Sequence, residues 1–200
     1  MSKTIKGPDG KPRCQWCEQT PDFFPYHDKE WGFPVDNDQR LFEKICLESF
    51  QSGLSWRTIL AKRENFRKAF HHFDFNKVAK FTQRDVTRLL NDAGIVRHRG
   101  KIEATINNAK RAQEMVKQEG SIAAFVWRYE PKKTAKPQTV STSDESIALS
   151  KDLKKLGWKF VGPTTVYAFM QAMGLVNDHV KNCVTRDKVE RARKRFKRPD

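Results

Sequence analysis

The chain has 200 residues, a length that fits one domain or at most two small ones. Hydrophobic residues make up 38% and charged residues 32%, and 14 Phe with 5 Trp supply enough apolar surface for a core without disulfides. No apolar run approaches the ~20 residues that span a membrane, and the N-terminal residues are not hydrophobic enough for a secretion signal. Membrane-spanning, secreted disulfide-rich and collagen-like proteins are therefore not expected.

The charge is strongly positive. The chain has 39 Lys and Arg against 24 Asp and Glu, which gives a formal net charge of +15. A field of this sign attracts polyanions, of which nucleic acid is the most common. A basic surface also serves solubility alone, so the charge favours a nucleic-acid partner without identifying one.

Apolar residues recur at intervals of three and four along most of the chain, and this spacing predicts an all-α protein. Helix-capping residues and glycine stops bound the expected helices, which in chain order cover about 39–49, 56–70, 83–93, 102–119, 143–156 and 164–173. Residues 128–143 are rich in Pro, Lys, Thr and Ser and are expected to form an exposed loop. Residues 1–13 and 186–200 are expected to be tails, the second being either a solvated segment or a phosphate-binding arm.

Cysteine and histidine residues near the two ends of the chain have the spacing of metal ligands. His179 and Cys183 lie four residues apart, so one helical face could bring both to a single ion. Cys14 and His27 are the natural candidates for the other two ligands of a tetrahedral site, although a His/Cys pair at this spacing also arises by chance. Cys14 and Cys17 could instead be half of another zinc site or a redox pair.

Glu48 is a carboxylate predicted to lie among apolar residues. It follows Leu41 by seven residues and Ile45 by three, which places it beside them on one face of a helix. A carboxylate in that position needs a partner, a raised pKa or a pocket to face. The alternative is a glutamate at the edge of the buried sector that reaches water.

Aromatic residues and a short turn surround this carboxylate in the sequence. Gly53 permits a turn, Leu54 is apolar in a predicted loop, and Trp56 begins the next helix. Trp16, Tyr26 and Trp31 flank the candidate metal ligands. Aromatic rings near a basic surface can stack on an unpaired base, although aromatic residues more often belong to the core.

Residues 153–166 predict a helix, a tight turn and a second helix. Gly157 and Gly162 allow close approach of the backbone to a ligand, and Pro163 begins the second helix. Free N–H groups at the start of that helix form a site for a phosphate oxygen, and the neighbouring lysines add positive charge. Such a hairpin would hold a DNA backbone without reading its sequence.

In combination these motifs resemble the 3-methyladenine DNA glycosylase I family of the helix-hairpin-helix glycosylase superfamily. The matching strings are Arg13-Cys-x-Trp16, Tyr26-His-Asp-x-Glu-Trp-Gly32, Leu41-Phe-Glu, Cys46-Leu-Glu48, Gln51-x-Gly-Leu-Ser-Trp56, Lys62-Arg-Glu64, Asp92-Ala-Gly-Ile, Arg97-His-Arg-Gly-Lys-Ile102, Phe160-Val-Gly162, Phe169-Met-Gln-Ala172 and Gly174-Leu-Val-Asn-Asp-His179. They extend over most of the chain, from about residue 14 to residue 183.

The resemblance implies an all-α helix-hairpin-helix DNA glycosylase fold. Its single helical unit covers residues 14–185, between a flexible basic tail at 1–13 and a basic tail at 186–200. It also implies one structural Zn²⁺ per chain that joins the N- and C-terminal segments, with Cys14, His27, His179 and Cys183 as ligands.

The resemblance further implies roles for individual residues. Glu48 is the implied catalytic residue, and the implied base-binding residues are Tyr26, Trp31, Trp56 and Trp16. Leu54 would fill the gap left in the duplex, and the implied DNA-binding residues are Gln51, Gly53, Leu54, Gly162, Pro163, Thr164 and Thr165. Asp178 is expected to orient or cap the segment that carries His179. Phe50 departs from the small or polar residue of the family, and it either narrows the mouth of the pocket or adds packing.

The activity implied is hydrolysis of the N-glycosidic bond of 3-methyladenine in alkylated double-stranded DNA. The base would be flipped out of the duplex and released, which leaves an abasic site. The resemblance implies a monofunctional, monomeric enzyme of the bacterial cytoplasm with no membrane partner. Two rivals remain open: a noncatalytic zinc-stabilised DNA-binding module, and a glycosylase for another lesion.

Overall fold

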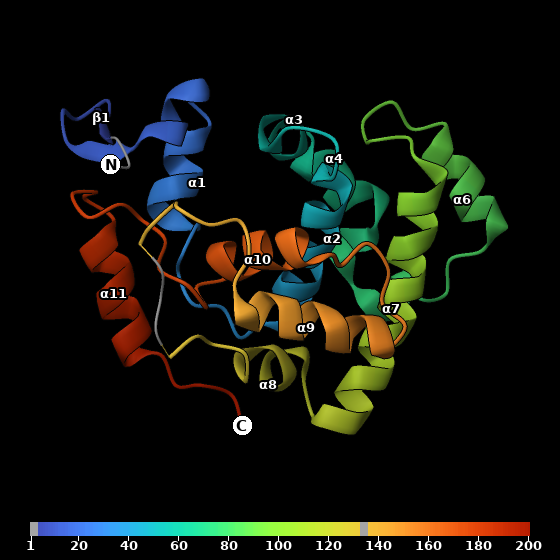
Figure 1. Ribbon diagram of the computed structural model, residues 1–200. Helices are drawn as coiled ribbons and strands as arrows, with labels where there is room; N and C mark the ends of the chain where they lie inside the picture. Colours follow the sequence, from blue (N-terminus) through green and yellow to red (C-terminus); the bar gives the residue numbers. More distant parts are fainter. Residues whose placement is uncertain (1–3, 133–135) are drawn as a thin grey trace.

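The fold is mostly helical (Figure 1). A computed structural model describes residues 4–132 and 136–200. The helices are α1 (Phe23–Lys29), α2 (Asp38–Gln51), α3 (Trp56–Ala61), α4 (Arg63–Ala69), α5 (Phe75–Val78), α6 (Gln83–Leu90), α7 (Arg99–Glu119), α8 (Ile122–Trp127), α9 (Asp144–Lys155), α10 (Pro163–Ala172) and α11 (Arg186–Arg195), with 3-10 turns η1 (Gln15–Gln19) and η2 (His71–Phe73). Strands β1 (Thr4–Lys6) and β2 (Pro12–Cys14) form an antiparallel pair that the all-α prediction did not include.

Polar side chains cap the start of several of the expected helices. The Asn37 side chain accepts a hydrogen bond from the Arg40 N–H at the start of α2, and Ser55 accepts one from the Thr58 N–H at the start of α3. Such caps satisfy N–H groups that have no partner inside the helix. Short-range chemistry therefore sets these helix starts, as the sequence predicted.

The structure divides one expected helix and contains others that were not expected. The single helix expected over 56–70 is divided into α3 and α4, because the backbone at Lys62 (φ −96°, ψ 0°) leaves the α-helical range. Helix α8 was not expected: all six of its residues are buried, so it shows no amphipathic period that a sequence pattern could reveal. The expected exposed loop does connect α8 to α9, apart from residues 133–135, which lie outside the described part of the chain.

Helix α2 lies at the centre of the fold. It packs against α10, α3, α7 and α8, so side chains on nearly all of its faces are buried. These include two charged residues, Lys44 and Glu48, which are 5% and 6% exposed. Charged groups are rarely buried without a partner, so this pair marks the part of the core where function is to be sought.

The N-terminal hairpin and the last helix lie on one side of the molecule. Figure 1 shows β1, α1 and α11 on that side, whereas α6 and α7 lie on the other. The tails expected at 1–13 and 186–200 are instead folded in their described parts: residues 4–14 form the β1–β2 hairpin, and residues 186–195 form α11. Val189 of α11 is fully buried, and Arg193 pairs with Glu130 at 2.7 Å, so one buried apolar residue and one ion pair help to hold this highly charged helix in place.

Candidate active site and metal centre

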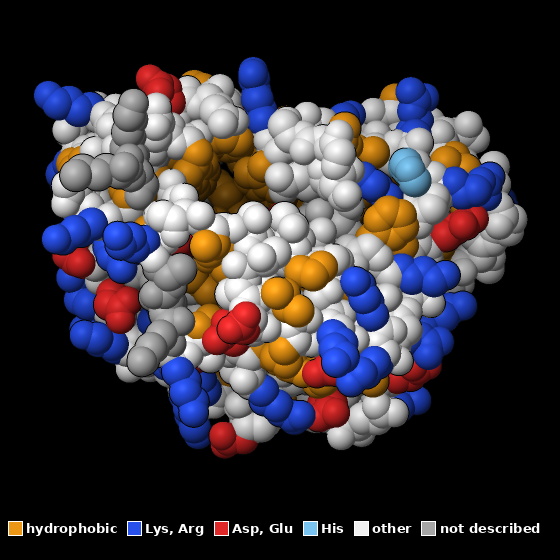
Figure 2. Space-filling model, in the orientation of Figure 1, with side chains coloured by type: hydrophobic (Ala, Val, Ile, Leu, Met, Phe, Trp, Pro, Cys, Tyr) orange, Lys and Arg blue, Asp and Glu red, His pale blue; other side chains and the backbone are white. Residues whose placement is uncertain are grey.

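A cavity of about 380 Å³ opens between α1, α2, α3 and α10. Its lining residues are Trp16, Gln19, Phe23, Tyr26, Trp31, Glu48, Gln51, Ser55, Trp56, Ala168 and Gln171. Figure 2 shows the hollow, with hydrophobic side chains on its walls. Its size and its mixture of aromatic walls with few polar groups are typical of a site for a small flat ligand.

Glu48 faces this cavity from the last turns of α2. Its side chain is 6% exposed, and one carboxylate oxygen (Oε1) accepts a hydrogen bond from the Lys44 ammonium at 2.7 Å. Of the two sequence interpretations, the structure therefore favours the carboxylate that has a partner and a pocket over the glutamate at a water-facing edge. The remaining carboxylate oxygen has the geometry to accept from a ligand in the cavity.

Lys44 is one residue of this site that sequence reasoning missed. Its ammonium donates a hydrogen bond to the Tyr26 hydroxyl at 2.7 Å and lies 3.4 Å from the centre of the Trp56 ring. Burial lowers the pKa of Lys44, and the attraction of Glu48 opposes this effect. Burial and the Glu48 charge raise the pKa of Tyr26, so its hydroxyl stays protonated. The i, i+4 spacing of Lys44 and Glu48 was the signal available in the sequence.

The four predicted base-binding aromatics come together in this cavity. Trp16 lies 5.1 Å from Trp31 and 6.2 Å from Tyr26 between ring centres, and Tyr26 lies 5.2 Å from Trp56. They come from η1, α1, the segment after α1 and α3, so no local pattern could have grouped them. The Trp56 indole N–H is buried without a hydrogen-bond partner among residues 4–132 and 136–200. The walls therefore offer ring faces to a bound ligand.

A second hollow of about 300 Å³ adjoins the first and shares Glu48, Gln51 and Ala168 with it. Its other lining residues are Ser52, Gly53, Leu54, Thr164 and Thr165. The turn after α2 and the start of α10 thus face each other across this hollow. Leu54 is 43% exposed, unusual for a large apolar residue, and Gly53 has a positive φ (+78°) that the turn requires. Gly162 and Pro163 precede the hollow at the start of α10.

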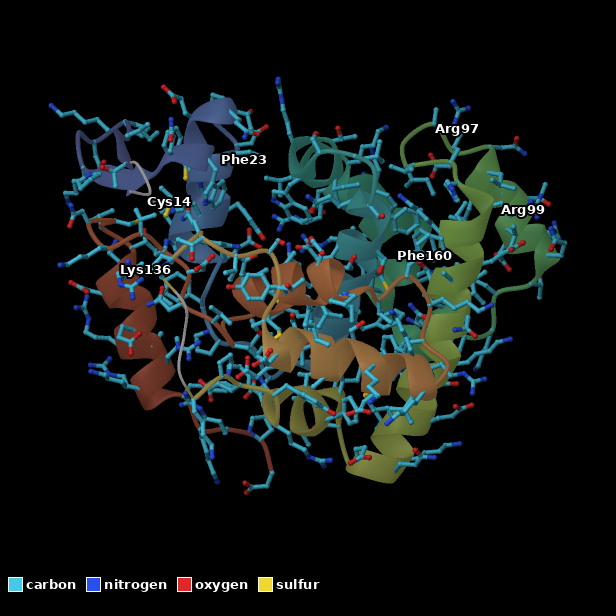
Figure 3. The ribbon with its side chains drawn as sticks, viewed as in Figure 1. Cys14, Phe23, Arg97, Arg99, Lys136 and Phe160 are labelled. Atoms are coloured by element: carbon cyan, nitrogen blue, oxygen red, sulfur yellow. The ribbon has the colours of Figure 1, made fainter. Side chains whose placement is uncertain are left out.

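The turn between α9 and α10 is fixed by side chains from two other helices. Asn108 of α7 receives a hydrogen bond from the Lys159 N–H at 2.8 Å and donates to the Lys159 carbonyl at 2.9 Å. Ser49 of α2 donates to the Phe160 carbonyl at 2.9 Å, which ties the turn to the helix that carries Glu48. Figure 3 shows Phe160 in this turn and Arg97 and Arg99 near the start of α7. The hairpin is therefore held rigidly beside a basic part of the surface.

Phe50 and Lys101 support the site from behind. The Phe50 ring is fully buried and lies 4.6 Å from Phe66 between ring centres, so it adds packing and does not narrow the mouth of the cavity. The Lys101 ammonium donates to the Phe50 and Ser52 carbonyls at 2.9 and 2.5 Å. Sequence reasoning placed Lys101 only in a basic string, whereas the structure shows it closing the end of α2.

The four candidate metal ligands converge into one buried cluster on the side of the molecule formed by both chain ends, where Figure 3 marks Cys14. The ligand atoms of Cys14, His27, His179 and Cys183 all lie within 4.8 Å of one another. His27 Nε2 is 3.1 Å from His179 Nδ1 and 3.4 Å from the Cys183 sulfur, and the Cys14 sulfur is 3.7 Å from His179 Nδ1. Tetrahedral zinc bonds of about 2.1–2.3 Å place ligand atoms roughly 3.4–3.8 Å apart, so the cluster fits such an ion.

Neighbouring groups orient both imidazoles for this cluster. The other nitrogen of His27, Nδ1, lies 2.7 Å from an Asp28 oxygen, and the other nitrogen of His179, Nε2, lies 3.0 Å from the Trp31 carbonyl. These acceptors hold the ring protons there and leave His27 Nε2 and His179 Nδ1 free to bind an ion. Arg13 in turn pairs with Asp28 at 2.8 Å. Cys17 is buried but does not belong to the cluster.

Asp178 lies beside this cluster in sequence but acts on the cavity. One of its oxygens accepts from the Gln138 N–H at 2.9 Å, and the other accepts from the Gln171 side chain at 2.5 Å. Gln171 lines the first cavity, and sequence reasoning missed it. Asp178 was expected to orient or cap the segment that carries His179, whereas its carboxylate contacts a loop residue, Gln138, and a pocket residue, Gln171.

Comparison with known proteins agrees with this geometry. Residues 16–186 match the model of the methyladenine glycosylase family. The chain is 51% identical over 180 residues to DNA-3-methyladenine glycosylase 1 of Escherichia coli K12, an alignment that covers 86% of this chain and 95% of the relative. The structure of a 3-methyladenine DNA glycosylase I has a TM-score of 0.81 at 47% identity, covering 86% of this chain and 98% of that one. A Tyr→Phe variant of such an enzyme in complex with 3-methyladenine has a TM-score of 0.82 at 38% identity, covering 87% and 97%.

The mostly helical fold and these similarities define a DNA glycosylase, a hydrolase of N-glycosyl bonds. The chain belongs to the methyladenine glycosylase family. In the described part of the chain, no helix is long and apolar enough to cross a membrane.

Proposed function

We propose that the chain hydrolyses the N-glycosidic bond of 3-methyladenine in alkylated double-stranded DNA. The observation that carries the proposal is the buried Glu48 carboxylate, which faces a cavity with aromatic walls next to an exposed Leu54. Binding a DNA backbone alone needs neither a buried carboxylate nor a pocket. The cavity therefore favours an enzyme over the noncatalytic DNA-binding module.

The reaction depends more on recognition of the damaged base than on acid catalysis. Alkylation at N3 makes the adenine of the nucleotide cationic, so the base is already a good leaving group. Glu48 accepts a hydrogen bond from the exocyclic amine and so selects against guanine, which has a carbonyl there. Trp56, Tyr26, Trp31 and Trp16 provide the walls on which the base stacks.

The reaction breaks the C1′–N9 bond, and its electron pair leaves with the base. A water molecule adds its oxygen to C1′ and loses a proton, so the products are the free base and an abasic site. The Glu48 charge favours the positive charge that develops on the sugar. We infer a monofunctional hydrolase, with no lysine adduct to C1′.

The target nucleotide reaches the cavity only after it leaves the duplex, at a cost of a few kcal/mol. Leu54 enters the gap, with Gln51 and Gly53 beside it, and offsets part of the lost stacking. The α9–α10 segment acts as the helix-hairpin-helix motif, with N–H groups of Gly162, Thr164 and Thr165 directed to the phosphates and Pro163 beginning the helix. The chain acts as a monomer.

We infer that the Cys₂His₂ cluster holds one structural Zn²⁺. The donor set supports this proposal, because two thiols and two imidazoles oriented by Asp28 and Trp31 match a closed tetrahedral site. When bound, the ion joins β2 and α1 to the segment before α11 and takes no part in the chemistry. It thereby fixes the wall of the cavity that α1 provides.

Base release from DNA tests the proposed function. Randomly methylated duplex DNA is incubated with excess enzyme, and the released bases are separated by chromatography in a single-turnover experiment. We expect 3-methyladenine as the product, and a Trp56→Ala variant should release it more slowly and bind the free base more weakly. Release of a different base would favour a glycosylase for another lesion, and DNA binding without any release would favour the noncatalytic module.

A further inference from the structure

Helix α11 carries a row of positive charges that the proposed function leaves without a role. Its ten residues include six Lys or Arg against two Asp or Glu. Lys188, Arg191 and Arg195 lie at positions i, i+3 and i+7, so they share one side of the helix, and all three are exposed. Within the part of the chain that the structure describes, none of them makes an ion pair with a carboxylate, whereas Arg193 on the packed side does. This basic row therefore presents its charge to solvent.

The helix that carries the basic row is held in a fixed position against the rest of the fold. Val189 is fully buried, and Phe196, just after the helix, lies 4.6 Å from Trp127 between ring centres. Glu130 accepts a hydrogen bond from Arg193 at 2.7 Å. Charges fixed in this way lose less conformational entropy on binding than the same charges on a flexible tail. A helix that served solubility alone would not need such anchoring.

Basic side chains of the α11 region lie on the face of the molecule into which the cavity opens. Figure 2, in the orientation of Figure 1, shows Lys and Arg side chains over this region together with the hollow. No residue of α11 lines either hollow. The match to the family model ends at residue 186, so nearly all of α11 lies outside it. The basic row is therefore separate from the hairpin and from the turn that carries Leu54.

We propose that the basic row of α11 is an accessory docking surface for the phosphate backbone of duplex DNA, beyond the hairpin and the Leu54 turn. Lys188 and Arg195 are seven residues apart, or about 10 Å along the helix axis, a length that corresponds to about three phosphates of one strand. The inference rests on the proposed function for its partner and adds a second contact with that partner. An anionic membrane fits less well, because a helix that lies on a membrane presents an apolar face to it. In α11 the apolar side is turned to the protein, with Val189 buried and Ala192 half-buried.

The salt dependence of DNA binding tests this inference. The affinity of the full chain for an undamaged duplex of about 25 base pairs is measured by fluorescence anisotropy from about 50 to 200 mM KCl, so that neither base flipping nor hydrolysis contributes. The variant Lys188→Gln/Arg191→Gln/Arg195→Gln removes the row and keeps good helix formers. Each lost phosphate contact lowers the slope of log K against log salt by about 1, so we expect a slope smaller by about 3. The affinity at about 100 mM salt should fall about 100-fold.

Two further variants control for net charge and for structure. Lys80→Gln/Lys110→Gln/Lys117→Gln removes three exposed lysines on or next to α7, on the other side of the molecule, and should keep the wild-type slope. Lys188→Arg/Arg191→Lys/Arg195→Lys keeps every charge of the row and should also keep the slope, because phosphate contacts depend chiefly on charge. All three variants should retain the wild-type melting temperature and the affinity for free 3-methyladenine.

The outcomes separate this inference from the proposed function. A folded α11 glutamine variant with the wild-type slope and affinity overturns the role of α11 and leaves the proposed function standing. Equal losses in the α7 control also overturn it, since net charge and not the row would then act. Weaker binding of this variant to phosphatidylserine vesicles, with no change on DNA, would overturn it in favour of a membrane surface. A wild-type chain that binds duplex DNA through the row but releases no base overturns the proposed function alone.

Discussion

The substitution Glu48→Gln should lower the stability of the protein as well as its activity. In the wild type the carboxylate and the Lys44 ammonium are 2.7 Å apart, with side chains 6% and 7% exposed. At that distance Coulomb's law gives about 6 kcal/mol for an effective dielectric constant of about 20. The glutamine amide still accepts a hydrogen bond from Lys44, which offsets part of the loss. We therefore expect the free energy of unfolding to fall by about 3 kcal/mol, within the range for a buried pair that loses one partner.

Urea unfolding followed by circular dichroism measures this change. Glu64→Gln is the matched control, because Glu64 pairs with Arg67 at nearly the same distance, 2.6 Å, but is 68% exposed. An exposed pair contributes at most about 1 kcal/mol, so the control should lose little stability. The double variant Lys44→Met/Glu48→Gln should recover most of the loss, since no buried charge remains. A loss below 1 kcal/mol for Glu48→Gln would refute the view that Lys44 is buried, charged and dependent on this carboxylate.

Three further predictions concern the zinc site, the wedge and the packing behind the cavity. Cys183→Ser should abolish stoichiometric zinc in elemental analysis and lower the melting temperature by about 10 °C. The remaining folded protein should keep its affinity for free 3-methyladenine. Unchanged zinc content would contradict the ligand assignment. Leu54→Ala should slow base release from duplex DNA about tenfold without weakening binding of the free base, since only the duplex must be opened; equal effects on both would place Leu54 in the base pocket. Phe50→Ala should lower the free energy of unfolding in urea by about 3–5 kcal/mol, because the Phe50 ring is fully buried. A change in free-base affinity with little loss of stability would show instead that Phe50 borders the pocket.

The amino-acid sequence determines the local features of this protein. Asn37 and Ser55 begin their helices as capping residues, and Gly53 supplies the positive φ of the turn before α3. These features depend on hydrogen bonds and torsion angles within a few residues, and such interactions can be read from short segments. The spacing of His179 and Cys183 likewise requires only one local segment. The family followed from several such strings in order.

Only the tertiary structure decides which of these groups meet. Lys44 is a charged residue in an amphipathic pattern, and nothing local shows that it is buried. It becomes buried because α2 is covered by other helices on nearly all sides, which leaves Glu48, Tyr26 and Trp56 as its partners. Helix α11 is similarly charged along its length, and it is held by one buried valine and by an ion pair between Arg193 and the distant Glu130. The burial of a residue depends on which other parts of the chain pack against it, so it cannot be predicted from a short segment of sequence.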